Sequence, residues 1–203
     1  MIKIKICGLR RIEDILIVNK YKPDYIGFIF AKNKTRTITL EDALIFKQSL
    51  NNDIIAVGVF KDNDIDEVIN IANSGAIDMI QLHGTESDSY ILEVKKHTNK
   101  PIIKAYRDSM YADYSLFDNI NPGSGKTFDW SSIKTNKPYF LAGGIDINNI
   151  ELAKKLNPYA IDLSSSVETN GFKDEEKIKE IIRKVREWKE DLATSVDNMF
   201  LKH

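Results

Sequence analysis

Residues 2–7, Ile-Lys-Ile-Lys-Ile-Cys, alternate strictly between two kinds of side chain, as a β-strand with two different faces does. The next stretch, Arg11–Tyr21, places apolar residues at helical spacing and carries acidic residues near its start. Another β-rich stretch, Tyr25–Phe30, follows. A strand, a helix and a second strand in this order predict two parallel strands joined by a crossover helix.

The same alternation continues along the rest of the chain. Further strands are expected at Ile54–Phe60, Ile77–Leu82, Pro101–Tyr106, Ser115–Asp118, Pro138–Ala142 and Tyr159–Leu163. Further helices are expected from Thr39 to about Leu50, at Asp64–Ser74 and Glu86–His97, from Asp146 or Asn148 to about Leu156, and at Asp174–Trp188. Eight strands over roughly 200 residues predict an α/β fold, a (β/α)8 or TIM barrel, because open doubly wound sheets usually have about five or six strands. We expect residues 1–203 to form this single domain.

Two crossovers of the predicted barrel are short. Arg107–Tyr114, after the fifth strand, leaves room for about two helical turns, and Ser131–Lys134, after the sixth, for about one. The C-terminal residues Ser195–His203 fit either an extension of the last helix or a frayed end.

Composition narrows the class of protein. Hydrophobic residues make up 42% and charged residues 29%, which excludes long disorder. The net charge of −1 gives no overall field for a nucleic-acid backbone, and no apolar run approaches the ~18 residues of a membrane span. The single cysteine cannot form an internal disulfide, and the alternating N-terminus lacks the apolar core of a signal peptide. We therefore expect a cytoplasmic protein with no nucleic-acid or membrane partner.

Side chains at the carboxyl ends of barrel strands line the active site in this fold. Lys3, Lys5 and Cys7 share one face of the first strand, so Cys7 is predicted at the barrel mouth with Lys5 beneath it. An ammonium at Lys5 should lower the thiol pKa and supply a thiolate base near neutral pH, although an inert buried cysteine is the commoner case. Asp118 ends the sixth strand and fits either a general acid or base or a solvated cap.

Small residues follow the last two strands. Gly143-Gly144 comes after the seventh strand and Ser164-Ser165-Ser166 after the eighth, where barrel enzymes commonly bind phosphate. The alternative is a tight turn at the glycines and a cap at the serines. Two adjacent loops of this kind favour a phosphate site.

Further polar residues are expected at the mouth. Arg36, in the loop after the second strand, has the bidentate donors that suit a substrate carboxylate, or else belongs to a solvated basic loop. His83 follows Gln81 on one strand face and fits a structural or a catalytic role. Gly123–Thr127 lacks the first glycine of a phosphate-binding P-loop and is better explained as a flexible active-site loop. No Cys/His cluster has metal-ligand spacing, so we expect no metal.

Several motifs occur in order along the chain. They are Lys5-Ile6-Cys7-Gly8-Leu9, Gln81-Leu82-His83-Gly84, Phe117-Asp118 followed by Pro122–Trp130, Leu141-Ala142-Gly143-Gly144, and Asp162-Leu163-Ser164-Ser165 followed by Val167-Glu168. Together they closely resemble the motifs of phosphoribosylanthranilate isomerases, from residue 2 to about residue 185.

This resemblance implies a (β/α)8-barrel isomerase of tryptophan biosynthesis that needs no cofactor. The family converts N-(5-phosphoribosyl)anthranilate into the corresponding 1-deoxyribulose 5-phosphate by an Amadori rearrangement. Carried over by motif, Cys7 is the general base, Asp118 the general acid and Arg36 the residue that holds the anthranilate carboxylate. The expected substrate contacts also include Gly143, Gly144, Asp162, Ser164 and Ser165.

Two positions depart from the family pattern. Lys34 stands where a small serine is common, and Ser166 where glycine is usual, so the carboxylate and phosphate contacts are expected to differ in detail. The expected partner is a small phosphorylated substrate, and the chain is expected to be a monomer or a homodimer. Alternatives are another phosphosugar isomerase or epimerase barrel, or a barrel that binds a phosphosugar without catalysis. The intact set of Cys7, Arg36 and Asp118 argues against the non-catalytic alternative.

Overall fold

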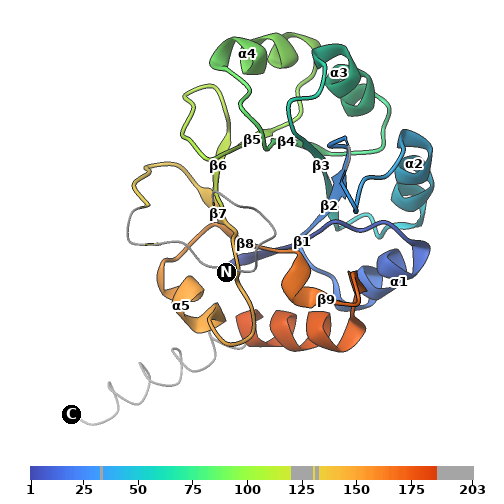
Figure 1. Cartoon of the computed structure of the whole chain (residues 1–203), viewed down its shortest axis with the longest axis vertical. Coiled ribbons are helices and arrows are strands. Elements are labelled where there is room, and N and C mark those ends of the chain that lie inside the picture. The colour runs from blue at the N-terminus through green and yellow to red at the C-terminus, as the bar shows by residue number, and fades with distance from the viewer. Residues whose placement is uncertain (33, 120–129, 131–132, 187–203) are drawn as a thin grey trace.

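The eight expected strands form a closed parallel barrel (Figure 1). The structure, a computed structural model, describes residues 1–32, 34–119, 130 and 133–186. Each strand pairs with its neighbour in sequence, and the first also pairs with the last, which confirms the predicted fold. The strands are β1 (Lys3–Cys7), β2 (Tyr25–Ile29), β3 (Ile55–Phe60), β4 (Met79–Leu82), β5 (Ile102–Ala105), β6 (Tyr114–Phe117), β7 (Tyr139–Leu141) and β8 (Ala160–Leu163).

Helices lie on the outside of the barrel (Figure 1). At the start of the second, the Thr39 hydroxyl accepts a hydrogen bond from the Asp42 amide, and Ser87 caps the fourth in the same way. The fifth helix begins after Asn149 rather than after Asp146 or Asn148, since Asp146 accepts from the amides of 148 and 149 and holds them in a turn. The helices are α1 (Ile12–Tyr21), α2 (Leu40–Ser49), α3 (Ile65–Asn73), α4 (Asp88–His97), α5 (Ile150–Lys155) and a further one over residues 175–186.

The crossover after β5 is shortened, as predicted. Residues 106–113 contain no helix and run as a loop outside the barrel (Figure 1). The crossover after β6 falls partly on residues 120–129 and 131–132, outside the described part of the chain, and residues 133–137 are not helical. The Gly123–Thr127 loop and Ser195–His203 also lie outside the described residues.

Strand alternation divides the core in two. Ile4 and Ile6 of β1 belong to the larger apolar cluster between the barrel and its helices, while Tyr25 and Phe140 belong to a second cluster inside the barrel. Lys5 and Cys7 point inward, as predicted, and both are buried. The polar groups that line the cavity lie toward the carboxyl ends of the strands.

Candidate active site

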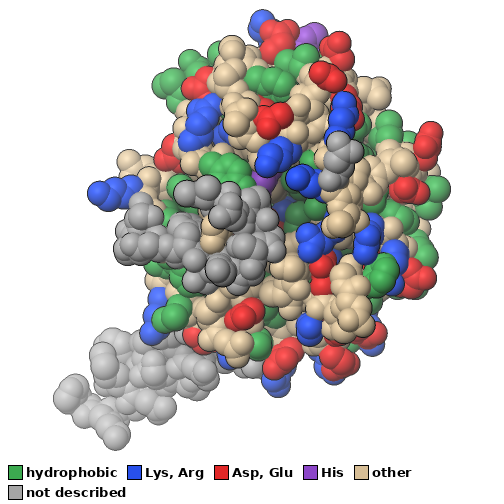
Figure 2. Space-filling model, viewed as in Figure 1, with side chains coloured by type: hydrophobic (Ala, Val, Ile, Leu, Met, Phe, Trp, Pro, Cys, Tyr) green, Lys and Arg blue, Asp and Glu red, His purple; other side chains and the backbone are tan. Residues whose placement is uncertain are grey.

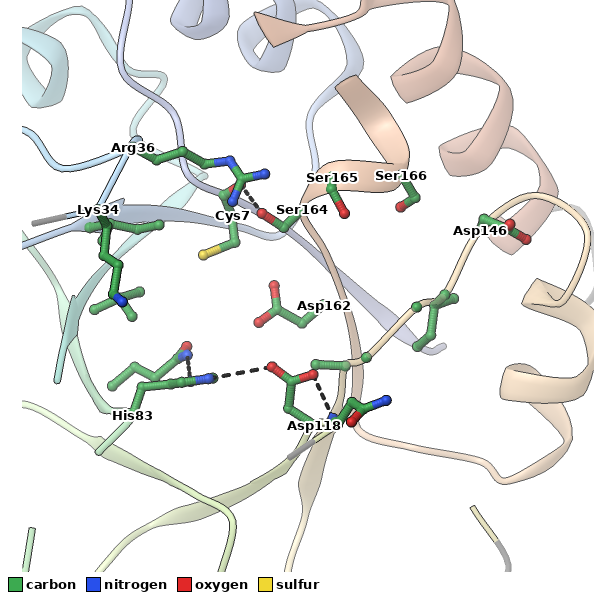
Figure 3. A pocket seen from close by; sticks show the side chains of 18 of the residues that line it. Cys7, Lys34, Arg36, His83, Asp118, Asp146, Asp162, Ser164, Ser165 and Ser166 are labelled. Atoms are coloured by element: carbon green, nitrogen blue, oxygen red, sulfur yellow. Dashed lines mark hydrogen bonds and ion pairs between the residues drawn. The ribbon is translucent and has the colours of Figure 1, made fainter. Parts of the chain in front are cut away.

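A cavity of about 770 Å³ opens at the carboxyl ends of the strands. Lys and Arg side chains lie beside a histidine at the centre of this face (Figure 2). All eight residues expected to take part in catalysis or substrate binding line the cavity, together with Gln81, His83 and Ser166 (Figure 3). The eight are Cys7, Arg36, Asp118, Gly143, Gly144, Asp162, Ser164 and Ser165.

One side of the cavity is built by adjacent strands. Lys5 of β1 stands in register with Asp162 of β8, and the Lys5 ammonium donates to Asp162 Oδ2 over 2.8 Å in a fully buried contact. Cys7 stands in register with Gly27 of β2. A Cβ at Gly27 would lie 2.6 Å from the Cys7 sulfur, so this glycine leaves the space that the thiol fills. The sulfur points into the cavity near Asp162 (Figure 3).

The thiol pKa differs from the expected one. Burial raises the pKa of Cys7 above its usual value, and this outweighs Lys5 and Lys173, which both lower it. The expectation that Lys5 brings the thiol pKa down toward neutral pH is therefore wrong. Burial would also lower the pKa of Lys5, but Asp162 and Cys7 outweigh it and raise that pKa, so the ammonium stays charged beneath the sulfur.

The opposite side is built by loop residues. Asp118, the first residue after β6, accepts at Oδ1 from the Asn119 amide over 2.7 Å. Its Oδ2 lies 3.3 Å from His83 Nε2, which also contacts the Tyr106 hydroxyl at 2.9 Å. The Gln81 amide nitrogen lies 2.9 Å from His83 Nδ1, so contacts at both ring nitrogens hold the imidazole between Gln81, Asp118 and Tyr106.

Gly143 makes room for the Asp118 carboxyl group. It has a φ of +87°, and a Cβ there would lie 2.9 Å from Asp118 Oδ1 and 2.7 Å from the Asn119 nitrogen. Gly143 was expected to contact substrate phosphate, and its position beside Asp118 gives it a second role that the sequence pattern does not indicate.

Arg36 reaches the cavity but is not free. Its Nε and Nη2 donate to the two oxygens of Glu168, both over 2.8 Å, so the guanidinium already has one carboxylate partner within the protein. Gly8 allows this placement, because a Cβ there would lie 2.6 Å from Arg36 Cδ.

Serine and glycine residues line the part of the cavity that is predicted to bind phosphate. Ser165 and Ser166 begin a short 3₁₀ turn, Ser165–Val167, and lie across the cavity from Lys34 (Figure 3). Ser164 differs from the other two, because its hydroxyl donates to the Cys7 carbonyl oxygen over 3.2 Å and so ties β8 to β1.

Comparison with known proteins identifies the family. The model of the N-(5'-phosphoribosyl)anthranilate isomerase family matches residues 4–184. A curated isomerase of this name from Endomicrobium trichonymphae is 48% identical over 92% of this chain and 99% of its own length. The chain belongs to the phosphoribosylanthranilate isomerase family.

Solved isomerases of the family share the fold. The Thermus thermophilus enzyme has a TM-score of 0.83 at 32% identity, and the match covers 91% of this chain and 98% of that one. A second isomerase, in complex with reduced 1-(o-carboxyphenylamino)-1-deoxyribulose 5-phosphate, has a TM-score of 0.75 at 27% identity and covers 90% of this chain and 97% of its own. The resemblance inferred from the motifs is confirmed.

Sequence reasoning missed four residues of this isomerase site. Gly27 carried a usable signal, since a glycine inside a strand often marks a close approach. Tyr106 gave none, because its hydroxyl reaches His83 only through a backbone φ of +69°. Glu168 appeared within a motif, and Lys173 in no motif, and neither was assigned a role. Only the fold brings Glu168 to Arg36 and Lys173 to Glu168.

The described residues contain neither a membrane-spanning helix nor a metal-binding cluster. Residues 1–32, 34–119, 130 and 133–186 contain no helix long and apolar enough to cross a membrane. The same part of the chain holds no group of three or more His, Cys, Asp or Glu side chains that could bind a metal ion.

Proposed function

We propose that this chain converts N-(5'-phosphoribosyl)anthranilate into 1-(2-carboxyphenylamino)-1-deoxyribulose 5-phosphate in tryptophan biosynthesis, with Asp118 as general acid and Cys7 as general base. The observation that carries the proposal is the position of these two groups. Both point into one cavity from different sides, in a chain of the isomerase family (Figure 3). A solved relative holds the reduced product, which supports the same class of ligand here.

Each chemical step has a group in place. Asp118 gives a proton to the furanose ring oxygen, the bond from that oxygen to C1 breaks, and the anthranilate nitrogen lone pair forms an iminium with C1. Cys7 then takes the C2 proton, and the electron pair of that bond forms C1=C2 while the iminium electrons return to nitrogen. Because the iminium acidifies the C2 proton, a modest base at Cys7 is sufficient. The resulting enol then loses its hydroxyl proton and gains a proton at C1, which gives the ketone.

The cavity suits the two anionic ends of this substrate. Arg36 offers guanidinium donors to the anthranilate carboxylate. Gly144, Ser165 and Ser166 also line the cavity, and their backbone and hydroxyl donors suit the phosphate. Asp162 has one oxygen without a hydrogen-bond partner among the described residues, and this buried acceptor suits a substrate hydroxyl or N–H between the two ends.

The test is a fluorescence assay. Enzymatically generated phosphoribosylanthranilate should lose its fluorescence when the purified chain is added. The Cys7→Ser/Asp118→Asn double variant, purified in the same way, should leave the signal unchanged and so excludes a contaminating host enzyme. Equal signal loss with both proteins, or none with the wild type, would contradict the proposed activity.

Four broader predictions accompany this function. We propose that residues 1–203 form one barrel domain, that the enzyme acts in the cytoplasm, and that it is a monomer or a homodimer that needs no cofactor. Limited proteolysis, cell fractionation, light scattering, and activity after exhaustive dialysis against a chelator test them in turn.

A further inference from the structure

A buried ion cluster lies behind Arg36. Glu168 Oε1 accepts from Arg36 Nε over 2.8 Å and from the Lys173 ammonium over 2.6 Å, while Glu168 Oε2 accepts from Arg36 Nη2 over 2.8 Å. The side chains of Glu168 and Lys173 are only 6% and 1% exposed. The Lys173 ammonium also donates to the Ser164 carbonyl oxygen over 3.0 Å. Glu168 is therefore held between the buried Lys173 side chain and the arginine of the cavity.

The chemistry of guanidinium says which donors remain. Two of its edges can hold a carboxylate with two parallel hydrogen bonds, namely the side edge of Nε and one Nη nitrogen, and the end edge of the two Nη nitrogens. Glu168 occupies the side edge of Arg36. The end edge, Nη1 with the second hydrogen of Nη2, is the bidentate edge left for a ligand.

We propose that Glu168, pinned by Lys173, is a positioning residue that turns the end edge of Arg36 into the cavity for the substrate carboxylate. This inference rests on the proposed function, since it concerns the carboxylate of that substrate. It also gives Lys173, from the hairpin of β9 (Glu168–Thr169) and β10 (Phe172–Lys173), a role in orienting Arg36 from behind.

The charges in the cluster support the assignment. Burial would raise the pKa of Glu168, but hydrogen bonds and charge from Arg36 and Lys173 outweigh it and hold the pKa below its usual range. Glu168 is therefore an anion throughout the neutral pH range, and both guanidinium contacts persist. A rotamer-rich arginine held in this way loses less entropy when it binds a ligand than a free one does.

Another buried pair provides a contrast. Glu86 and Lys104 are each about 1% exposed and lie 2.9 Å apart. Among the residues that the structure describes, Glu86 accepts only from backbone amides besides its lysine, and Lys104 donates otherwise only to backbone carbonyls. The pair fixes loops, whereas the cluster of Glu168 holds a side chain that lines the cavity. This difference makes Glu86→Gln the matched control.

The test compares two inhibitors that differ by one group. One is the reduced product analogue 1-(2-carboxyphenylamino)-1-deoxyribitol 5-phosphate, and the other is the same molecule without its carboxyl group. Glu168→Gln should weaken binding of the first by about tenfold or more, in the range of a hydrogen bond to a charged group, and of the second by less than about threefold. In the assay, KM should rise more than kcat falls. Glu168→Asp should recover part of the lost affinity.

Other outcomes of these binding measurements would contradict the positioning role of Glu168. Equal loss for both inhibitors, or no loss for either, would overturn the positioning role of Glu168. Glu86→Gln should change both affinities by the same factor, and a selective loss there would also overturn it. If Glu168→Gln does not fold, the Glu168→Gln/Lys173→Met pair removes both buried charges and should show the same selective loss. Inhibitor binding is measured by calorimetry without turnover, so an inactive wild type contradicts the proposed function separately.

Discussion

The two sides of the cavity are built differently. On the Cys7 side, Lys5, Cys7 and Asp162 belong to paired strands, and their spacing is set by backbone hydrogen bonds. On the Asp118 side, Asp118, His83 and Tyr106 are each the first residue after a strand. Their contacts are between side chains, at 3.3 Å and 2.9 Å. We therefore expect the strand side to be the more rigid of the two and the loop side to have more freedom to adjust.

On the loop side, the backbone of Tyr106 is strained. A bulky residue at a φ of +69° is strained, by roughly 1–3 kcal/mol. The strained backbone brings the tyrosine ring edge-on to His83, with the centroids 5.0 Å apart, and the hydroxyl to its Nε2. The loop side thus orders a carboxyl group by side-chain contacts, whereas the strand side orders a thiol by register and close packing.

The largest effect is expected at the strand side. Cys7→Ser should lower kcat by about 10²–10⁴-fold, because a hydroxyl is too weak a base at neutral pH and no neighbouring strand residue replaces it. KM should change far less, since serine keeps nearly the same shape. Steady-state kinetics at saturating substrate measure both. A kcat close to that of the wild type would return Cys7 to the role of a buried core residue.

On the loop side, Asp118→Asn should lower kcat by about 10²-fold or more. Asparagine has almost the size of aspartate and keeps a hydrogen bond to the ring oxygen, but it cannot supply a proton. The affinity for the reduced product analogue should stay within about tenfold of the wild type, or ~1.4 kcal/mol. If affinity and activity fall in parallel, Asp118 is a binding residue and His83, its neighbour at 3.3 Å, becomes the first candidate acid.

Two glycine variants compare the rigidity of the sides directly. Gly27→Ala puts a Cβ 2.6 Å from the Cys7 sulfur, between paired strands. This variant should lower kcat by about 10²-fold, because displacing a catalytic group by about 1 Å can have an effect of that size. Gly143→Ala puts one 2.9 Å from Asp118 Oδ1, in a loop that can shift, and we expect a smaller loss of about tenfold.

The control for these variants is Gly75→Ala. Gly75 has a similar φ of +90° but no atom within 4 Å of its added Cβ. This variant should lose about 1–2 kcal/mol of stability and no kcat, which separates backbone strain from displacement of a catalytic group. Thermal melts and kinetics on all three proteins provide the comparison. An equal or larger kcat loss for Gly143→Ala would show that the loop side is the less adjustable one.

The sequence predicts the strand side better than the loop side. Alternation in residues 2–7 places Lys5 and Cys7 inward, and the structure confirms this. Local patterns also predict the barrel and put Asp118 at its mouth. Neither periodicity nor spacing can show that His83 faces Asp118 or that Tyr106 reaches His83, because these contacts join residues 35 and 23 positions apart across separate loops.

Burial and ion pairing explain the remaining misses. The expectation for the Cys7 pKa counts the charge of Lys5 but not the burial of the sulfur, and burial has the larger effect. Likewise, the sequence places Arg36 in a basic loop, whereas Glu168 occupies one of its edges from 132 positions along the chain. The burial of the sulfur and the ion pair of Arg36 both depend on which groups the closed barrel brings together, so only the fold reveals them.

The smallest effect is a shift of pH dependence on the strand side. Lys5 lowers the pKa of Cys7 by its charge and by a hydrogen bond, although burial keeps the net pKa above its usual value. Lys5→Met removes the ammonium, so the thiol pKa should rise further and the acidic limb of kcat/KM should move to higher pH. Cys7 is the only cysteine of the chain, so the rate of its alkylation against pH reports the same ionisation directly.

The control must separate this local charge from a general loss of positive charge. Lys20→Met removes a surface ammonium that pairs with Glu175 on the outside of the barrel, and it should leave both pH profiles in place. Lys5→Met also leaves Asp162 buried without its cation, so the Lys5→Met/Asp162→Asn variant is needed if the single one fails to fold. That variant also removes Asp162, which raises the thiol pKa, so its profile should move less than that of Lys5→Met. If the alkylation profile of folded Lys5→Met matches that of Lys20→Met, Lys5 has no part in tuning the base, and the strand side owes its chemistry to the position of the sulfur alone.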